Sequence, residues 1–177
     1  MIFRRMLHLI APVLLVGALA GCAPQPNPIK GTHSMSTVDP SMTLEKAKAE
    51  SLAMQDRLVG FFPAESIATR QTEQTAHLRR CDADGVYLWA GFTKLTFNQP
   101  IDTDTVIEAI GKEFETDGRF VVVIKTDKWG DKRVDLSSGD GAGYLITPEA
   151  KDHTDITMDA WSPCFLLPDG MSPLDTY

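Results

Sequence analysis

The sequence has little cysteine, little histidine and no excess of basic residues. Its three cysteines, Cys22, Cys81 and Cys164, lie far apart in 177 residues, which excludes a disulfide-dense miniprotein and any Cys-x-x-Cys metal or redox pair. The 17 basic residues against 24 acidic ones give a formal charge of −7, so we expect no nucleic-acid partner and no general attraction to an anionic bilayer. The hydrophobic content of 43% is typical of one globular domain.

Motifs for cofactors are also missing. The segment 139–143 contains three glycines, but it has neither the GxGxxG spacing nor a Lys-Ser/Thr pair, and Asp140 would repel a phosphate, so we predict a strand connection. The segment 82–85 resembles the start of a calcium-binding loop, yet Thr93 stands where that loop needs its final glutamate. The sequence therefore predicts no cofactor and no metal.

Residues 1–21 have the pattern of a secretory signal peptide. Arg4 and Arg5 precede an apolar run over 6–20, which is shorter than the ~20 residues that a membrane-spanning helix needs. The run is followed by Leu19-Ala20-Gly21-Cys22, which resembles the lipobox of bacterial lipoproteins. The chain is therefore expected to leave the cytoplasm.

The lipobox resemblance implies a fate for Cys22. In such proteins the thiol receives a diacylglycerol, the signal is cut before the cysteine, and the new amine is commonly acylated, for example with palmitate. Two or three acyl chains form a durable anchor, so we expect a lipoprotein held on the extracytoplasmic face of the cell membrane. The alternative is an ordinary cleaved signal that leaves Cys22 as a free thiol.

The segment 22–42 is predicted to be a flexible tether. It contains four prolines and few large apolar side chains, a composition that cannot form a packed core. His33 lies in this segment and is expected to be a solvated linker residue. The remaining residues, 43–177, are expected to form a single globular domain.

The first half of that domain mixes helical and strand patterns. Apolar spacing predicts a helix over 43–62, capped by Ser41 or Thr43, and a second helix that begins at Asp102 or Asp104 and ends near 117–118. Between these helices, 67–80 is polar and is expected to be either a short helix or an irregular crossing. The aromatic segment 85–97 predicts a long strand, with a possible bulge at Gly91.

The second half contains strand patterns joined by turns. The continuous Val and Ile run over 120–126 predicts a strand buried on both faces. Turns at 127–131 and 139–143 then separate three further predicted strands, at 132–137, 144–147 and 155–162. Because short turns join antiparallel neighbours, we predict an α+β two-layer sandwich, a mostly antiparallel sheet with helices on one face.

Cys81 and Cys164 remain once Cys22 is lipidated. In an oxidising envelope we expect them to form a disulfide, and the alternative is two buried free thiols. A catalytic cysteine is not supported, because His77 and His153 offer no recognisable nucleophile arrangement.

Residues for catalysis are few. Asp152, His153 and Asp155 place two carboxylates near an imidazole, which is compatible with a metal or a general base, but no second cluster accompanies them, so a solvated loop is the favoured explanation. Trp129, at a turn, and Tyr144, after the glycine-rich turn, are the residues that we expect to contact a partner. We assign no catalytic residue.

The ending Cys164-Phe165-Leu166-Leu167-Pro168, together with the lipobox and the cysteine pair, resembles the small actinobacterial lipoproteins of the mycobacterial LppA type. This resemblance implies a membrane-tethered protein of the cell envelope and supplies no catalytic residues. Our leading hypothesis is a binding domain for an envelope protein or cell-wall component. The alternatives are a hydrolase-like envelope enzyme that uses Asp152, His153 and Asp155, and an accessory subunit of a membrane complex.

Overall fold

The structure, a computed structural model, describes residues 38–149 and 152–177. The predicted signal peptide, Cys22 and the tether up to residue 37 lie outside the described residues. The described elements, in chain order, are α1 (Leu44–Val59), a short 3-10 helix (Ala64–Ser66), β1 (Ile67–Thr72), β2 (Leu78–Arg80), β3 (Val86–Phe97), α2 (Thr103–Asp117), β4 (Val121–Thr126), β5 (Lys132–Ser137), β6 (Gly143–Pro148), β7 (Asp155–Trp161) and β8 (Phe165–Leu166).

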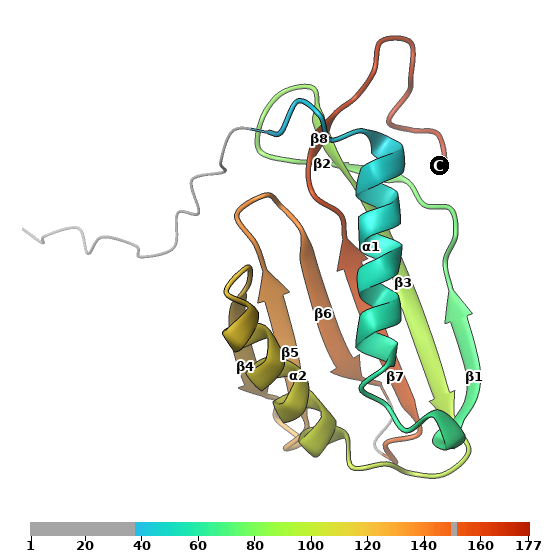
Figure 1. The fold of residues 1–177 in the computed structure, drawn as a ribbon. Coiled ribbons are helices and arrows are strands. Elements are labelled where there is room, and N and C mark those ends of the chain that lie inside the picture. The colour runs from blue at the N-terminus through green and yellow to red at the C-terminus, as the bar shows by residue number, and fades with distance from the viewer. Residues whose placement is uncertain (1–37, 150–151) are drawn as a thin grey trace, which may run out of the picture. The chain divides into compact units, whose positions relative to one another are not determined.

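The strands form one antiparallel sheet with the order β1-β3-β7-β6-β5-β4, and β2 and β8 pair with the first half of β3. Both helices cover the same face: α1 packs on β3 and β7, and α2 packs on β4 and β5 (Figure 1). The predicted α+β class is confirmed.

Both helices begin at the predicted caps. The Thr43 hydroxyl accepts a hydrogen bond from the backbone N–H of Lys46 at 3.3 Å, and the Asp102 carboxylate accepts one from Thr105 at 3.0 Å, so each satisfies a donor that the first helical turn leaves free. Helix α2 ends at Gly118, whose φ of 73° lies in the left-handed region that favours glycine. Of its apolar residues at helical spacing, Ile107, Ile110 and Phe114 are buried and Val106 is partly buried.

The buried stripe of α1 includes polar side chains. Ser51 and Gln55 are fully buried in it, whereas Leu52 is only partly buried. The Thr93 hydroxyl donates to Oε1 of Gln55 at 2.8 Å and lies 2.9 Å from the hydroxyl of Thr72. These bonds make a polar contact between helix and sheet, because buried polar atoms need partners.

The prediction for residues 67–80 is wrong. This segment forms β1 and β2, which both pair with β3. The side chains of β1 are mostly exposed because it is an edge strand, and only one neighbour covers it. A polar edge strand lacks the alternation that marks half-buried strands, so its sequence resembles a loop.

The prediction for β4 is half correct. The strand forms, but it is not buried on both faces: it is the other edge of the sheet, and Val121 and Val123 are 49% and 39% exposed. The apolar run of β4 resembles that of a central strand, because strands buried on both faces have the same composition.

Gly91 has a different role from the predicted bulge. The β3–β7 register runs through Gly91 without a break, and the shift in the sheet lies on β1, between Ile67 and Thr69. A Cβ at Gly91 would stand 2.2 Å from the indole of Trp89. Glycine therefore provides the space in which the buried Trp89 ring lies along its own strand.

The structure contains the expected disulfide between Cys81 and Cys164. Cys81 precedes β3 and Cys164 precedes β8, a short strand that the sequence analysis did not predict. The 138–142 turn packs against this bond, because the amide of Cys164 donates to the carbonyl of Asp140 at 2.9 Å and a Cβ at Gly141 would stand 2.3 Å from Sγ of Cys164. The segment 139–143 is thus a strand connection, as predicted.

Candidate functional site

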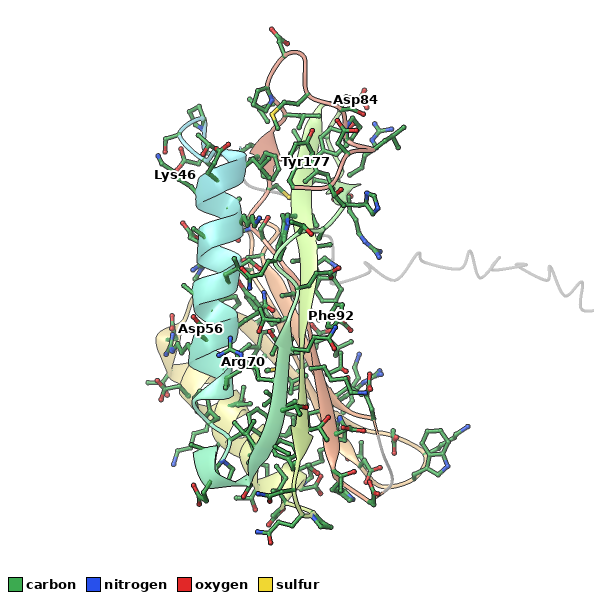
Figure 2. The ribbon with its side chains drawn as sticks, turned by 90° about the vertical axis from the view of Figure 1, so that its right-hand side faces the viewer. Lys46, Asp56, Arg70, Asp84, Phe92 and Tyr177 are labelled. Carbon is green, nitrogen blue, oxygen red and sulfur yellow. A yellow bond between two sulfur atoms is a disulfide. The ribbon has the colours of Figure 1, made fainter. Side chains whose placement is uncertain are left out.

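The helices leave the opposite face of the sheet open. Side chains alternate along each strand, so Leu95 and Phe97 of β3 point into the core, while Phe92 and Lys94 point to the other face. Figure 2 shows Phe92 on the side of β3 that faces away from α1. The strand register aligns Phe92 with Asp159 of β7, and Asp159 with Leu145 of β6.

A groove lies on this open face near the β1–β2 connection. It consists of two adjoining cavities of about 170 and 350 Å³, which share Glu73, Arg79 and Ala90. Phe92, Asp159 and Trp161 line the smaller cavity, and the remaining lining comes from Gly91, Thr75, Ala76, His77 and Thr176. The groove thus combines two aromatic side chains with one cation and two carboxylates.

The position of Trp161 follows from glycine on the neighbouring strand. Gly143 lies directly opposite Trp161, and a Cβ there would stand 3.3 Å from Cε3 of the indole. The ring therefore lies across β6. This arrangement presents part of an aromatic surface on the open face, the kind of side chain that is enriched at protein interfaces.

Two carboxylates on the open face, Asp159 and Glu149, have pKa values shifted in opposite directions. Burial raises the pKa of Asp159, the nearby Glu149 raises it further, and Arg79 opposes both effects. Lys94 bonds Glu149 at 3.0 Å, and this contact helps to lower the pKa of Glu149, after the larger effect of the hydrogen bond from Thr157. The raised pKa of Asp159 means that its charged form is disfavoured, so a hydrogen-bond donor from a partner would stabilise it.

Asp152, His153 and Asp155 do not converge on one point. Asp152 accepts from its neighbour Thr154, and Asp155 accepts from the Thr96 hydroxyl at 2.7 Å. Within residues 38–149 and 152–177, no group of three or more His, Cys, Asp or Glu side chains could hold a metal ion.

His153 instead joins two other segments. Its Nδ1 lies 2.6 Å from the hydroxyl of Thr103, at the start of α2, and its Nε2 lies 3.4 Å from a carboxylate oxygen of Asp131, in the β4–β5 turn. In space, the contacts run from a threonine to a histidine to an aspartate, the order of a nucleophile, a base and an orienting acid. However, Thr103 is only 1% exposed, so its hydroxyl is shielded from solvent. A cavity of about 260 Å³ beside His153 is also lined by Asp102, Thr103 and Asp104.

The two predicted partner-contact residues have opposite positions. Trp129 is 61% exposed at the tip of the β4–β5 turn, with Lys128 over its ring. Tyr144 is 2% exposed and lies in the core between the sheet and the helices, so it is not available to a partner. Burial raises the pKa of Tyr144 to about 12. Tyr144 was predicted to lie on the surface, but its position on β6 faces the core.

The groove residues were not predicted as a site. The alternation over 155–162 indicates that Asp159 and Trp161 share a face, but it does not indicate which face the helices cover. Arg79 and Glu73 lie in the segment whose strands were not predicted. No sequence signal links these two residues to Phe92.

The comparisons with known proteins concern the fold. No protein-family model and no curated protein matches the chain. A DUF4853 family protein from Actinomyces odontolyticus is similar in structure, with 15% identity over 80% of this chain and 77% of that chain and a TM-score of 0.49. The putative lipoprotein LppA from Mycobacterium tuberculosis has 14% identity over 73% of this chain and 83% of that chain and a TM-score of 0.40. Both similarities are distant, and no residue role is carried over from either.

Among the described residues, neither helix is long and apolar enough to cross a membrane.

Proposed function

We propose that this protein is a bacterial lipoprotein, anchored through Cys22 to the extracytoplasmic face of the cell membrane, which binds another envelope protein on its open sheet face. The observation that carries the binding proposal is the groove around Phe92 and Trp161. It places aromatic surface beside Arg79 and Asp159 on a face that neither helix covers. The proposed anchor rests on the lipobox sequence that ends at Cys22.

An interface of this kind suits a protein partner. Aromatic side chains and arginine contribute most strongly to protein–protein binding, and charged groups at the rim select the partner. The chain as a whole is acidic, so a partner with basic side chains near an apolar patch fits the carboxylates Glu73 and Asp159 best.

The anchor is tested by replacing the modified atom. Cys22→Ser, expressed in the full chain in a bacterial host, is expected to move the protein from the washed membrane fraction to the soluble fraction. Ala23→Ser is the matched control, because it changes the adjacent residue by one hydroxyl and should stay in the membrane fraction. If Cys22→Ser remains in the membranes to the same extent as Ala23→Ser, the proposed anchor is wrong.

The binding face is tested by photo-crosslinking in living cells. A benzophenone amino acid at Phe92 is expected to give a discrete product with another protein, and the same probe at Lys112, on the exposed side of α2, is the matched control. A product from Phe92 only supports the proposal. Equal yields from both positions contradict it, and a glycan adduct in the mass spectrum would favour a cell-wall component as the partner.

The proposal also predicts that the yield of the Phe92 crosslink depends on the side chains of the groove. Trp161→Ala removes aromatic surface from the groove, and Arg79→Gln removes its cation. Each is expected to reduce the crosslink from Phe92 severalfold. If neither reduces it, the groove is not the contact.

A further inference from the structure

One row of side chains crosses the open face at the groove. The amide of Glu73 donates to the carbonyl of Phe92 at 3.0 Å, and the strand register places Phe92 opposite Asp159 of β7. Neighbouring strands lie about 4.8 Å apart, and all three side chains line the same small cavity. The phenyl ring of Phe92 therefore lies between two carboxylates.

The described part of the chain leaves both acids of this row without a bonded partner. Among the described residues, no ion pair and no side-chain hydrogen bond joins Glu73 or Asp159 to another residue. Arg79 also lines the cavity and favours the charged form of Asp159, but Arg79 is exposed, whereas both acids are half-buried. Lys94, the next cation along this face of β3, bonds Glu149 at 3.0 Å. With two acids and one arginine, the lining of the small cavity has a net negative charge.

We propose that the small cavity receives one arginine side chain of the partner protein, with its guanidinium on the ring of Phe92 and its N–H groups directed at Glu73 and Asp159. This inference rests on the proposed function, since it names the group of the partner that the open face recognises. An aromatic face attracts a cation that lies within about 6 Å of its centre, and carboxylates accept strong hydrogen bonds from a guanidinium. Both attractions act at the same place in this cavity.

The size and shape of the cavity favour arginine over other cations. Its volume of about 170 Å³ is below the ~300–1,000 Å³ that is typical of small-molecule sites, so it suits a single side chain. The guanidinium is planar, stacks on aromatic faces and has five donors, whereas the lysine ammonium is compact and strongly hydrated. A planar group that lies on Phe92 has donors at its edge for the acid on either side. Arginine is also among the residues that contribute most to protein interfaces.

The adjoining cavity accommodates the segment of the partner that carries this arginine. Its volume is about 350 Å³, it continues past Ala76 and His77, and Arg79 lines it as well as the smaller cavity. Main-chain carbonyls of a segment that passes here would accept hydrogen bonds from the Arg79 guanidinium. Arg79 and the two acids therefore have separate roles, because Arg79 binds acceptors of the partner and the acids bind its cation.

The arginine site is tested without the partner by NMR of the detergent-extracted full chain. The probe is N-acetylarginine amide, and N-acetylcitrulline amide, which has nearly the same shape without the charge, is the matched control. We expect the arginine compound to shift the amide signals of Gly91, Phe92 and Asp159 with a Kd of the order of 1 mM. The citrulline compound should cause shifts that are about tenfold smaller. Equal shifts from both compounds, or none from either, would overturn the proposal.

The charge of Asp159 is tested in living cells with a photo-crosslinker outside the cavity. The register sets Leu145 of β6 between Asp159 and Asp135, so a benzophenone amino acid at Leu145 lies beside both acids and leaves the cavity lining unchanged. Asp159→Asn keeps the shape of the side chain and removes its charge, and we expect it to reduce the crosslink by about tenfold or more. Asp135→Asn is the matched control, because Asp135 does not line the cavity, and it should reduce the crosslink by less than about twofold.

The outcomes distinguish this inference from the proposed function. If the Leu145 crosslink forms but Asp159→Asn and Asp135→Asn affect it equally, the open face binds a partner by other chemistry, and only the arginine site is overturned. A glycan adduct that persists in Asp159→Asn would overturn it too, since an uncharged sugar tolerates asparagine. If neither Phe92 nor Leu145 gives a crosslink, the proposed function is wrong, and the NMR titration still decides whether the cavity binds arginine.

Discussion

The indole Nε1 of Trp89 donates a hydrogen bond of 3.0 Å to the main-chain oxygen of Tyr177. Residues 76 and 177 add two reciprocal main-chain bonds, of 2.9 and 3.1 Å, beside it. The ring of Trp89 is fully buried in a cluster with Leu78 and Phe165. The last residue of the sequence therefore closes this cluster and provides the partner that the buried indole needs.

Deletion of Tyr177 is expected to lower the free energy of unfolding by about 1–3 kcal/mol, because it leaves the Trp89 N–H without its acceptor. Urea denaturation followed by tryptophan fluorescence measures the change. Leu174→Ala is the control, since Leu174 is 83% exposed and should change stability little. Equal stability of the deletion variant and the native chain would show that the bond is not needed.

Gly91→Ala is expected to destabilise the protein by about 1–3 kcal/mol, because the new methyl group would overlap the Trp89 ring. A double-mutant cycle with Trp89→Leu tests the cause. In the Trp89→Leu background, Gly91→Ala should cost much less, since the ring is gone. Equal costs in the two backgrounds would indicate that backbone conformation, rather than the ring, requires glycine.

Replacing both cysteines in Cys81→Ala/Cys164→Ala is expected to remove about 4–5 kcal/mol in the loop-entropy model, given the sequence separation of 83 residues. The measurement is urea denaturation with and without reductant. Reductant should destabilise the native protein and leave the double variant unchanged. If reductant affects both equally, the disulfide is not the cause.

Asp140 predicts a pH dependence of stability. Burial raises the pKa of Asp140, but hydrogen bonds from Ser138 and Ala142 and the charge of Arg119, whose Nη2 lies 3.1 Å from the carboxylate, together lower it below 3.8. A folded-state pKa below the unfolded one stabilises the protein above the unfolded value, and this contribution is lost as the pH falls through the folded value.

Asp140→Asn is therefore expected to reduce stability at pH 7 by about 1 kcal/mol or less, since the ion pair is partly exposed, and to make the loss of stability below about pH 4 shallower. Thermal unfolding from pH 7 to pH 2 measures both effects. Asp175→Asn, on an exposed turn, is the control. The same acid profile for native protein and Asp140→Asn would contradict the role of this carboxylate.

His153→Ala is expected to lower stability by about 1 kcal/mol, because it removes the contacts to Thr103 and Asp131 that join the β6–β7 connection to α2 and to the β4–β5 turn. The crosslink from Phe92 should persist. Circular dichroism would show whether the His153→Ala variant is folded. Loss of the Phe92 crosslink in a folded variant would indicate that His153 takes part in binding.

Local patterns predicted the elements that bury one face and begin at a good cap. The sequence of α2 marks both of its ends, because Asp102 caps its start and Gly118 ends it. Between them, the apolar spacing of Ile107, Ile110 and Phe114 indicates the buried side. The hairpins at 127–131 and 138–142 are marked by their turn residues. These features depend on neighbours within a few residues, which a single sequence contains.

The positions of strands in the sheet depend on distant partners and were not predicted. The Val and Ile run of β4 and the polar residues of β1 both lie at edges of the sheet. The composition of β4 suggests a central strand, and that of β1 suggests a loop. The groove was missed for the same reason: Phe92, Asp159 and Arg79 come together only through the pairing of β2 and β7 with β3. The cysteine pair needed no such information.

The segment between Cys81 and Cys164 contains two turn tips, at 128–130 and 139–141, each with exposed residues. A protease that cuts either tip would therefore leave two fragments still joined through sulfur. The piece that contains β6, β7 and β8 would stay with the piece that begins at the N-terminus. Separation of the two halves of the domain would require two separate events, a nick and a reduction.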